Sequence, residues 1–140
     1  MNVFSYRELE IGHTESFSVQ ITEKQIDLFL RLSGDENPLH QDAQFARENG
    51  FASKLVYGML TASFYSTLAG VHLPGRYCLL QEISIKFTKP VFVGDVLTVC
   101  GKIEEKVDAY EILVIKAKIT NQKNQPVSRA VMKVGVLHEK

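Results

Sequence analysis

The pattern of apolar and polar positions divides the chain into a helical first half and a β-rich second half. Apolar and polar residues alternate over residues 16–21, which predicts a short strand. Apolar residues then recur at helical spacing over residues 23–32, and a capping box of Thr22 and Gln25 predicts that a helix begins there. Gly34 is expected to end this helix.

The next segment, Asp35-Glu36-Asn37-Pro38-Leu39-His40, is expected to be irregular, because proline disfavours a helical backbone at the residue before it. Asp42 is a suitable cap for a short helix that Asn49-Gly50 ends. From Tyr57 to Gly70 nearly every residue is apolar, small or hydroxyl-bearing, and none is charged. This pattern predicts a buried helix of about 14 residues, near 20 Å, too short to span a membrane.

The second half of the chain consists of strand patterns separated by turn residues. Strands are expected over residues 81–87, 96–107, 110–120 and 127–137, with a tight hairpin at Asp108-Ala109 and another turn over 121–125. Helices followed by a run of strands indicate an α+β fold with an antiparallel sheet. A sheet wrapped around the long helix is the simplest way to bury both, within one domain spanning residues 1–140.

Charge and composition narrow the class of protein. The chain has sixteen Lys and Arg residues and sixteen Asp and Glu residues, so it lacks the net positive charge that is typical of nucleic-acid-binding proteins. Residues 1–14 contain charges and no apolar signal-peptide core, and no stretch is long enough for a membrane span. The two cysteines, Cys78 and Cys100, are expected to be reduced thiols in a cytoplasmic protein.

Asp35 and His40 are the strongest candidates for catalytic residues. A carboxylate and an imidazole together can hold one water molecule and move protons to and from it. They can share a water only if the chain folds back between them, and Asn37-Pro38 is a turn-initiating pair that supplies the bend. The residues alone also fit a surface loop in which Asp35 caps a backbone amide and His40 is solvated.

Gly58 and Ser63 lie at the start of the predicted buried helix. The Gly58 N–H has no partner within the helix and lies at its positive end, where it suits a developing oxyanion. Tight packing of the helix is the alternative explanation for this glycine. The Ser63 hydroxyl can contact a ligand or bond back to the preceding turn. The remaining histidines, His13, His72 and His138, show no ligand spacing, so no metal site is expected.

Three segments together resemble one family. Residues 35–40 match the D-x-N-P-x-H motif of the MaoC-type (R)-specific enoyl-CoA hydratases and dehydratases. Residues 58–63, Gly-Met-Leu-Thr-Ala-Ser, are similar to the G-M-L-x-A-S at the start of that family's central helix. Residues 86–95 resemble its K-F-x-x-P-V-x-x-G-D strand and turn, and the resemblance runs from about residue 16 to 137.

The resemblance implies a single hot-dog fold, a long central helix wrapped by an antiparallel sheet, in a homodimer or higher oligomer. It implies reversible hydration of a trans-2-enoyl thioester to the (R)-3-hydroxyacyl thioester. No separate cofactor is expected, because coenzyme A or acyl carrier protein is part of the substrate. Asp35 and His40 would activate the water, the Gly58 N–H would be the oxyanion donor, and four residues would contact substrate: Asn37, Tyr57, Met59 and Ser63.

One position departs from the family, which often has histidine where this chain has Tyr57. Two other functions stay open at this point. A hot-dog acyl-thioesterase has the same fold, although such enzymes place a carboxylate on or near the central helix and residues 57–70 contain none. A non-catalytic acyl-thioester-binding protein is the second alternative, and it would bind acyl-CoA without turnover.

Overall fold

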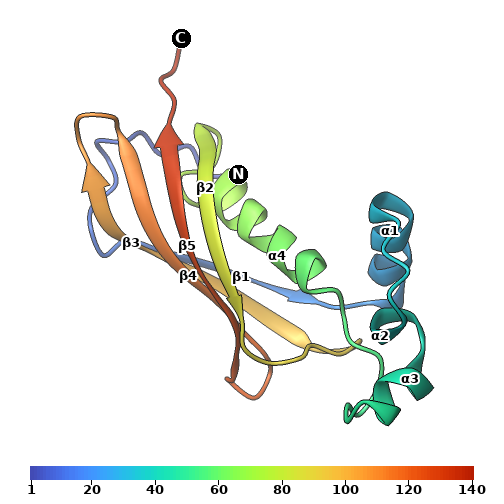
Figure 1. Ribbon diagram of the computed structural model, residues 1–140. Helices are drawn as coiled ribbons and strands as arrows, with labels where there is room; N and C mark the ends of the chain where they lie inside the picture. The colour runs from blue at the N-terminus through green and yellow to red at the C-terminus, as the bar shows by residue number, and fades with distance from the viewer.

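The computed structural model describes all residues from 1 to 140. One antiparallel sheet of five strands curves around a helix that lies on its inner face (Figure 1). The strand order is β1-β3-β4-β5-β2, so β1 and β2 are the two edges. The strands are β1 (Thr14–Gln20), β2 (Cys78–Phe87), β3 (Val96–Val107), β4 (Ile112–Thr120) and β5 (Pro126–Val136).

The helices fall into two groups (Figure 1). The central helix α4 (Gly58–Thr67) continues into a π-helical turn η1 (Leu68–His72) and packs against the sheet. The other three are α1 (Glu23–Ser33), α2 (Pro38–Gln41) and α3 (Ala43–Glu48). They lie beyond one end of the sheet, beside the first turn of α4, and residues 23–48 are called the helical arm below.

The core lies between α4 and the concave face of the sheet. Ile103 of β3, Ile115 of β4 and Met132 of β5 pair in register, and all three are fully buried. From the helix side, Tyr65 and Leu68 are also fully buried. Alternate residues along β3 and β4 face solvent, which is the pattern of a sheet with only one covered face.

Most predicted elements are confirmed. Helix α1 begins with the capping box of Thr22 and Gln25 and ends at Gly34, whose φ of 71° lies in the left-handed region. Asp42 caps α3 by accepting hydrogen bonds from the amides of Gln44 and Phe45. The sheet wrapped around a helix is the architecture that the order of elements predicted.

Three details of the prediction are wrong. Residues 35–40 are not wholly irregular, because Pro38 begins the short helix α2 with Asn37 as its cap. The turn between β3 and β4 spans residues 108–111, two residues more than predicted, and Glu111 has a left-handed φ of 51°. Helix α4 is not buried on every side, since Met59 is 63% exposed.

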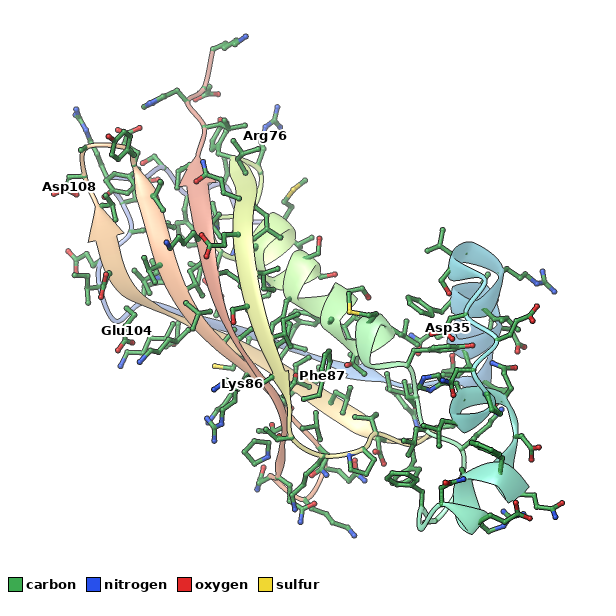
Figure 2. All side chains as sticks on the ribbon, in the orientation of Figure 1. Asp35, Arg76, Lys86, Phe87, Glu104 and Asp108 are labelled. Carbon is green, nitrogen blue, oxygen red and sulfur yellow. The ribbon has the colours of Figure 1, made fainter.

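The edge strand β2 also exposes apolar side chains. Leu79 is 47% exposed and Phe87 is 52% exposed, and no strand pairs with the outer edge of β2. Figure 2 shows Phe87 on the side of β2 that faces α4 and Lys86 on the opposite side.

Both cysteines are free. None of the helices combines the length and apolar character that a bilayer crossing requires.

Candidate active site

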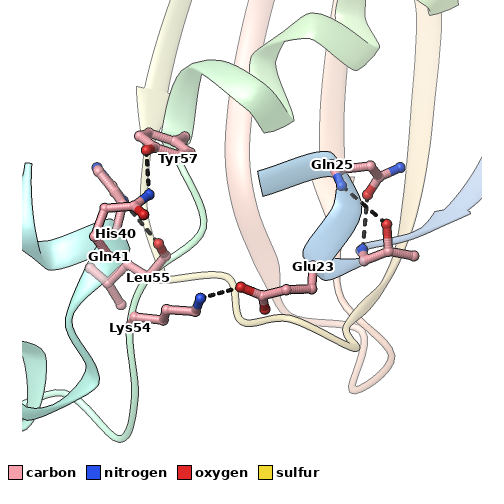
Figure 3. A network of polar contacts seen from close by, with 8 residues as sticks. Glu23, Gln25, His40, Gln41, Lys54, Leu55 and Tyr57 are labelled. Atoms are coloured by element: carbon pink, nitrogen blue, oxygen red, sulfur yellow. Dashed lines mark hydrogen bonds and ion pairs between the residues drawn. The ribbon is translucent and has the colours of Figure 1, made fainter. Parts of the chain in front are cut away.

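His40 lies on α2 with one ring nitrogen fixed by the backbone. Its Nδ1 is 2.9 Å from the carbonyl oxygen of Leu55 (Figure 3). A carbonyl oxygen only accepts hydrogen bonds, so Nδ1 carries the proton of the neutral ring and Nε2 keeps its lone pair. His40 also lines a cavity. The arrangement therefore presents a hydrogen-bond acceptor that can take a proton from a water molecule.

Asp35 lies between α1 and α2, on the helical arm (Figure 2). Its Oδ1 accepts a hydrogen bond from the Asn37 amide at 3.0 Å, and this turn folds the chain back toward α2. Its backbone carbonyl accepts a hydrogen bond from the Tyr57 hydroxyl at 2.7 Å. The residue is exposed, so its carboxylate is accessible to water.

Tyr57 joins the two ends of the motif. Its ring lies against the His40 ring at a centroid distance of 4.2 Å, while its hydroxyl holds the Asp35 carbonyl. Both residues therefore contact Tyr57, whereas the Asp35 carboxylate caps the Asn37 amide, as in the alternative that the sequence left open. A water shared by the two side chains stays a prediction. Burial is the main cause that raises the pKa of the Tyr57 phenol above its ordinary value, so the phenol is neutral near pH 7.

Gly58 is the first residue of α4, and the preceding residue supplies no side-chain cap. Its N–H therefore has no acceptor within the helix and lies at the positive end of the helix dipole. Gly58 lines the same cavity as His40. A Cβ atom at this position would lie 3.1 Å from the Phe87 ring. Glycine therefore allows the close approach of the Phe87 ring, whereas any residue except proline would carry the N–H.

The cavity has a volume of about 340 Å³ and mostly apolar walls. Its apolar lining comes from the loop before α4, from the end of β2, from the loop after it and from the start of β5: Phe51, Leu55, Val56, Phe87, Val91 and Val127. Thr61 and Lys89 add polar groups, and the Thr61 hydroxyl donates to the Gly58 carbonyl at 2.7 Å. A slot of this kind suits an acyl chain that ends in a polar group.

Several predicted substrate contacts lie outside the cavity lining of this chain. Asn37 accepts a hydrogen bond from the Leu39 amide and caps α2. Ser63 donates to the Leu60 carbonyl at 2.6 Å, the back-bond that the sequence left open, although three residues back rather than four. Met59 points to solvent, and Tyr57 is buried behind His40. For these four residues, contact with substrate stays a prediction.

Sequence reasoning missed Phe51, Thr61 and Lys89 as cavity residues. Thr61 and Lys89 stand at unspecified positions of two of the segments that resemble the family, and Phe51 lies outside all three, so no sequence signal marked any of them. No group of three or more His, Cys, Asp or Glu side chains is arranged to hold a metal ion. Of the three groups expected to do chemistry, His40 and Gly58 line the cavity, whereas Asp35 is not among its lining residues.

Comparison with known proteins decides the family. A sequence profile of the MaoC like domain matches residues 9–124. The chain belongs to the MaoC-like family. Within this family, the (R)-specific enoyl-CoA hydratase of Aeromonas caviae is 40% identical over 94 residues, which are 67% of this chain and 70% of that protein. The (R)-specific enoyl-CoA hydratase of Rhodospirillum rubrum is 35% identical over 105 residues, covering 72% and 73%.

Solved structures of MaoC-like proteins have the same fold. The (R)-hydratase from A. caviae superposes with a TM-score of 0.89 at 31% identity, covering 94% of this chain and 99% of that chain. The R-hydratase PhaJ1 from Pseudomonas aeruginosa, in its unliganded form, has a TM-score of 0.89 at 30% identity and covers 96% and 86%. The fold is the hot-dog fold that the resemblance implied.

Proposed function

We propose that this protein is an (R)-specific enoyl-CoA hydratase, a hydro-lyase that interconverts a trans-2-enoyl thioester plus water with the (R)-3-hydroxyacyl thioester. One observation carries the proposal: an imidazole with its Nδ1 bound to a carbonyl lines an apolar cavity, together with the open amide at the start of α4. The names of the A. caviae and R. rubrum relatives support the same reaction.

In this mechanism His40 and Asp35 hold one water molecule beside Cβ of the substrate. The water donates one hydrogen to Nε2 of His40 and the other to the Asp35 carboxylate. As its oxygen bonds to Cβ, one proton passes to the Asp35–His40 pair, and the pair returns a proton to Cα. Water is thus added across the double bond. A positioned acid or base of this kind accelerates a reaction by about 10²–10⁴-fold.

The thioester carbonyl becomes enolate-like while the water adds. The Gly58 N–H, at the positive end of α4, would donate a hydrogen bond to that oxygen. Preorganised donors act where charge develops, and one such donor contributes about 10²–10³-fold to the rate. The acyl chain would occupy the apolar part of the cavity, with Phe87 against Gly58 as one wall.

The direct test is hydration of crotonyl-CoA, followed by loss of the enoyl ultraviolet absorbance and chiral analysis of the product. We expect the (R)-3-hydroxy thioester and no release of free thiol. Free CoA, detected with a thiol reagent, would indicate the thioesterase alternative, and bound acyl-CoA without turnover would indicate a non-catalytic binding protein. Repeating the assay with crotonyl-acyl carrier protein compares the two carriers.

The assignment of residues is tested by Asp35→Asn and His40→Ala. Each is expected to lower kcat by at least about 10²-fold, because each removes one of the two groups that hold the water. Glu36→Gln, the neighbouring exposed acid, and His138→Ala, a histidine that pairs with Glu111 at the other end of the chain, are the matched controls. Wild-type turnover in both site variants would contradict the assignment.

We also propose that two copies associate along β2 to form a homodimer. The outer edge of β2 is unpaired, and apolar side chains gather on β2 and on the neighbouring face of α4: Met59, Leu79, Leu80, Ile83 and Phe87. Open edges and apolar patches of this kind are normally covered by a partner. Light scattering should give twice the chain mass, and Ile83→Lys should give a monomer.

The free cysteines support the cytoplasmic location expected from the sequence.

A further inference from the structure

We propose that Tyr57 is a positioning residue that sets the placement of Asp35, His40 and the Gly58 amide relative to one another. This inference rests on the proposed hydration reaction. Tyr57 is only 1% exposed and is not among the residues that line the cavity, so the contacts that the structure gives it are with other residues of the chain. It nevertheless contacts both ends of the Asp35–His40 segment, and Figure 3 shows its bond with Gln41 beside His40.

The hydrogen bonds of the phenol have a single possible direction. A carbonyl oxygen cannot donate, so the Tyr57 hydroxyl donates its one proton to the Asp35 carbonyl at 2.7 Å. The phenol oxygen then accepts from Nε2 of Gln41 at 2.6 Å. The bonds run from Gln41 through Tyr57 to Asp35, and they fix both ends of the segment 35–41 to one buried atom.

The ring of Tyr57 determines the orientation of the imidazole. It is packed between Phe29 of α1, at 4.7 Å between centroids, and His40 of α2, at 4.2 Å. His40 is therefore held by two contacts, the Leu55 carbonyl at Nδ1 and the face of the Tyr57 ring. Together they fix the direction in which the Nε2 lone pair points.

The backbone of Tyr57 connects this residue to the Gly58 amide, the third group of the proposed site. Its carbonyl carbon is bonded to the Gly58 nitrogen, and its carbonyl oxygen accepts from the amides of Leu60 and Thr61 in the first turn of α4. Any shift of Tyr57 would therefore move the imidazole, the Asp35 carbonyl and the Gly58 N–H together. Misplacement of reacting groups by about 1 Å can lower a rate by roughly 10²-fold.

Tyr57→Phe tests the proposal, because it keeps the ring and removes only the hydroxyl. Tyr65→Phe is the matched control: Tyr65 is a fully buried tyrosine of α4 whose hydroxyl bonds to Ser128 and to neither end of the Asp35–His40 segment. We expect Tyr57→Phe to lower kcat about tenfold and to change KM less than about twofold, while Tyr65→Phe keeps kcat. Equal kcat values for wild type and Tyr57→Phe would overturn the proposal.

A double-mutant cycle separates positioning from general stability. If Tyr57 acts through Asp35, adding Tyr57→Phe to Asp35→Asn should cause little further loss of kcat, whereas independent effects would multiply. Multiplying effects, with each variant folded by circular dichroism, would contradict positioning through Asp35. Gln41→Leu, at an exposed residue, should lower kcat in the same direction and by less than Tyr57→Phe.

Amide hydrogen exchange tests the positioning without relying on activity. The amides of Asn37 and Leu39 donate to the side chains of Asp35 and Asn37 within the segment. We expect both amides to exchange at least about tenfold faster in Tyr57→Phe and unchanged in Tyr65→Phe. Unchanged exchange in both variants would refute the proposal. A wild-type protein that does not hydrate enoyl thioesters would refute the proposed function instead, and the exchange result would still decide the role of Tyr57.

Discussion

The helical arm and the sheet with α4 differ in how they are held together. In the sheet and α4 the core is a continuous set of buried apolar side chains. In the arm only Ile26 of α1 and Ala46 of α3 are buried, and α2 has no buried residue. Ile26 belongs to that core and Phe29 packs against it, and the arm is otherwise attached by specific contacts, among them the Lys54–Glu23 ion pair and the bonds around Tyr57.

Because of this difference, most residues that stabilise the fold and the two residues proposed to activate water lie in different regions. Buried apolar area is the main source of folding free energy, and most of the buried apolar side chains lie in the sheet and the central helix, with only two in the arm. Asp35 and His40 lie on the arm, whereas Gly58 begins the helix that the sheet surrounds. The proposed site therefore lies where a rigid element meets a weakly buried one, so its geometry depends on few contacts.

The largest effect on stability is expected in the core. Ile115→Ala should lower the free energy of unfolding by about 2–5 kcal/mol, because it leaves a cavity at a fully buried position. Urea unfolding followed by circular dichroism measures this change. Leu32→Ala, at an arm residue that is 84% exposed, is the control and should change stability by less than about 0.5 kcal/mol. A comparable loss in both variants would contradict the contrast between the regions.

A smaller effect is expected at the junction between the regions. Gly58→Ala should lower kcat about tenfold, because the new Cβ atom would lie 3.1 Å from the Phe87 ring and would displace the ring or the amide. Phe87→Ala in the same chain should restore much of the loss by removing the contact. Gly70→Ala is the control, since a Cβ atom there meets nothing within 4 Å. Full activity of Gly58→Ala would show that the close approach has no catalytic role.

Within the arm, the capping box should stabilise α1 alone. Thr22→Ala should lower the local stability of α1 by about 1 kcal/mol, because it removes the side chain that accepts from the Gln25 amide. Hydrogen exchange should accelerate in α1 while the amides of the sheet exchange at unchanged rates. Thr22→Ser keeps a hydroxyl and should behave as wild type. Faster exchange throughout the chain would mean that the arm and sheet unfold together.

The smallest effect is confined to alkaline solution and to the end of the sheet opposite the arm. Burial, together with a hydrogen bond from the Tyr6 hydroxyl to Asp108 at 2.7 Å, raises the pKa of Tyr6 from 10.0 to about 12. The neutral phenol is favoured in the folded state, so its contribution to stability is complete below pH 10 and is lost as the pH rises through about 12.

Urea midpoints measured from pH 9 to pH 12 test this dependence. Tyr6→Phe should remove part of the decline, because it has no proton to lose. Tyr110→Phe, at a tyrosine that is 77% exposed, should follow the wild-type curve. An identical slope in all three proteins would mean that Tyr6 ionises as it does in the unfolded chain.

Local sequence signals predicted most of the elements and failed where a tertiary contact decided the outcome. The capping box at Thr22 and the cap at Asp42 act within one turn of helix, so residues close in sequence determine them. The exposed face of α4 was not predicted, because an apolar sequence does not say which side the curved sheet leaves open. The same sequence did not say whether Gly58 serves packing or an open amide; the close approach of Phe87 supports packing, and the amide's role stays a proposal.

The sequence alone determined the α+β class, the order of elements and, through residues 35–40, the pairing of Asp35 with His40 as candidates. These depend on periodicity, caps and turn residues, which are properties of neighbouring positions. Only the tertiary structure decided that Tyr57 lies between Phe29 and His40 and bonds to Asp35. Those contacts join residues 17–28 positions apart in the chain, and packing of the arm on the start of α4 brings them together.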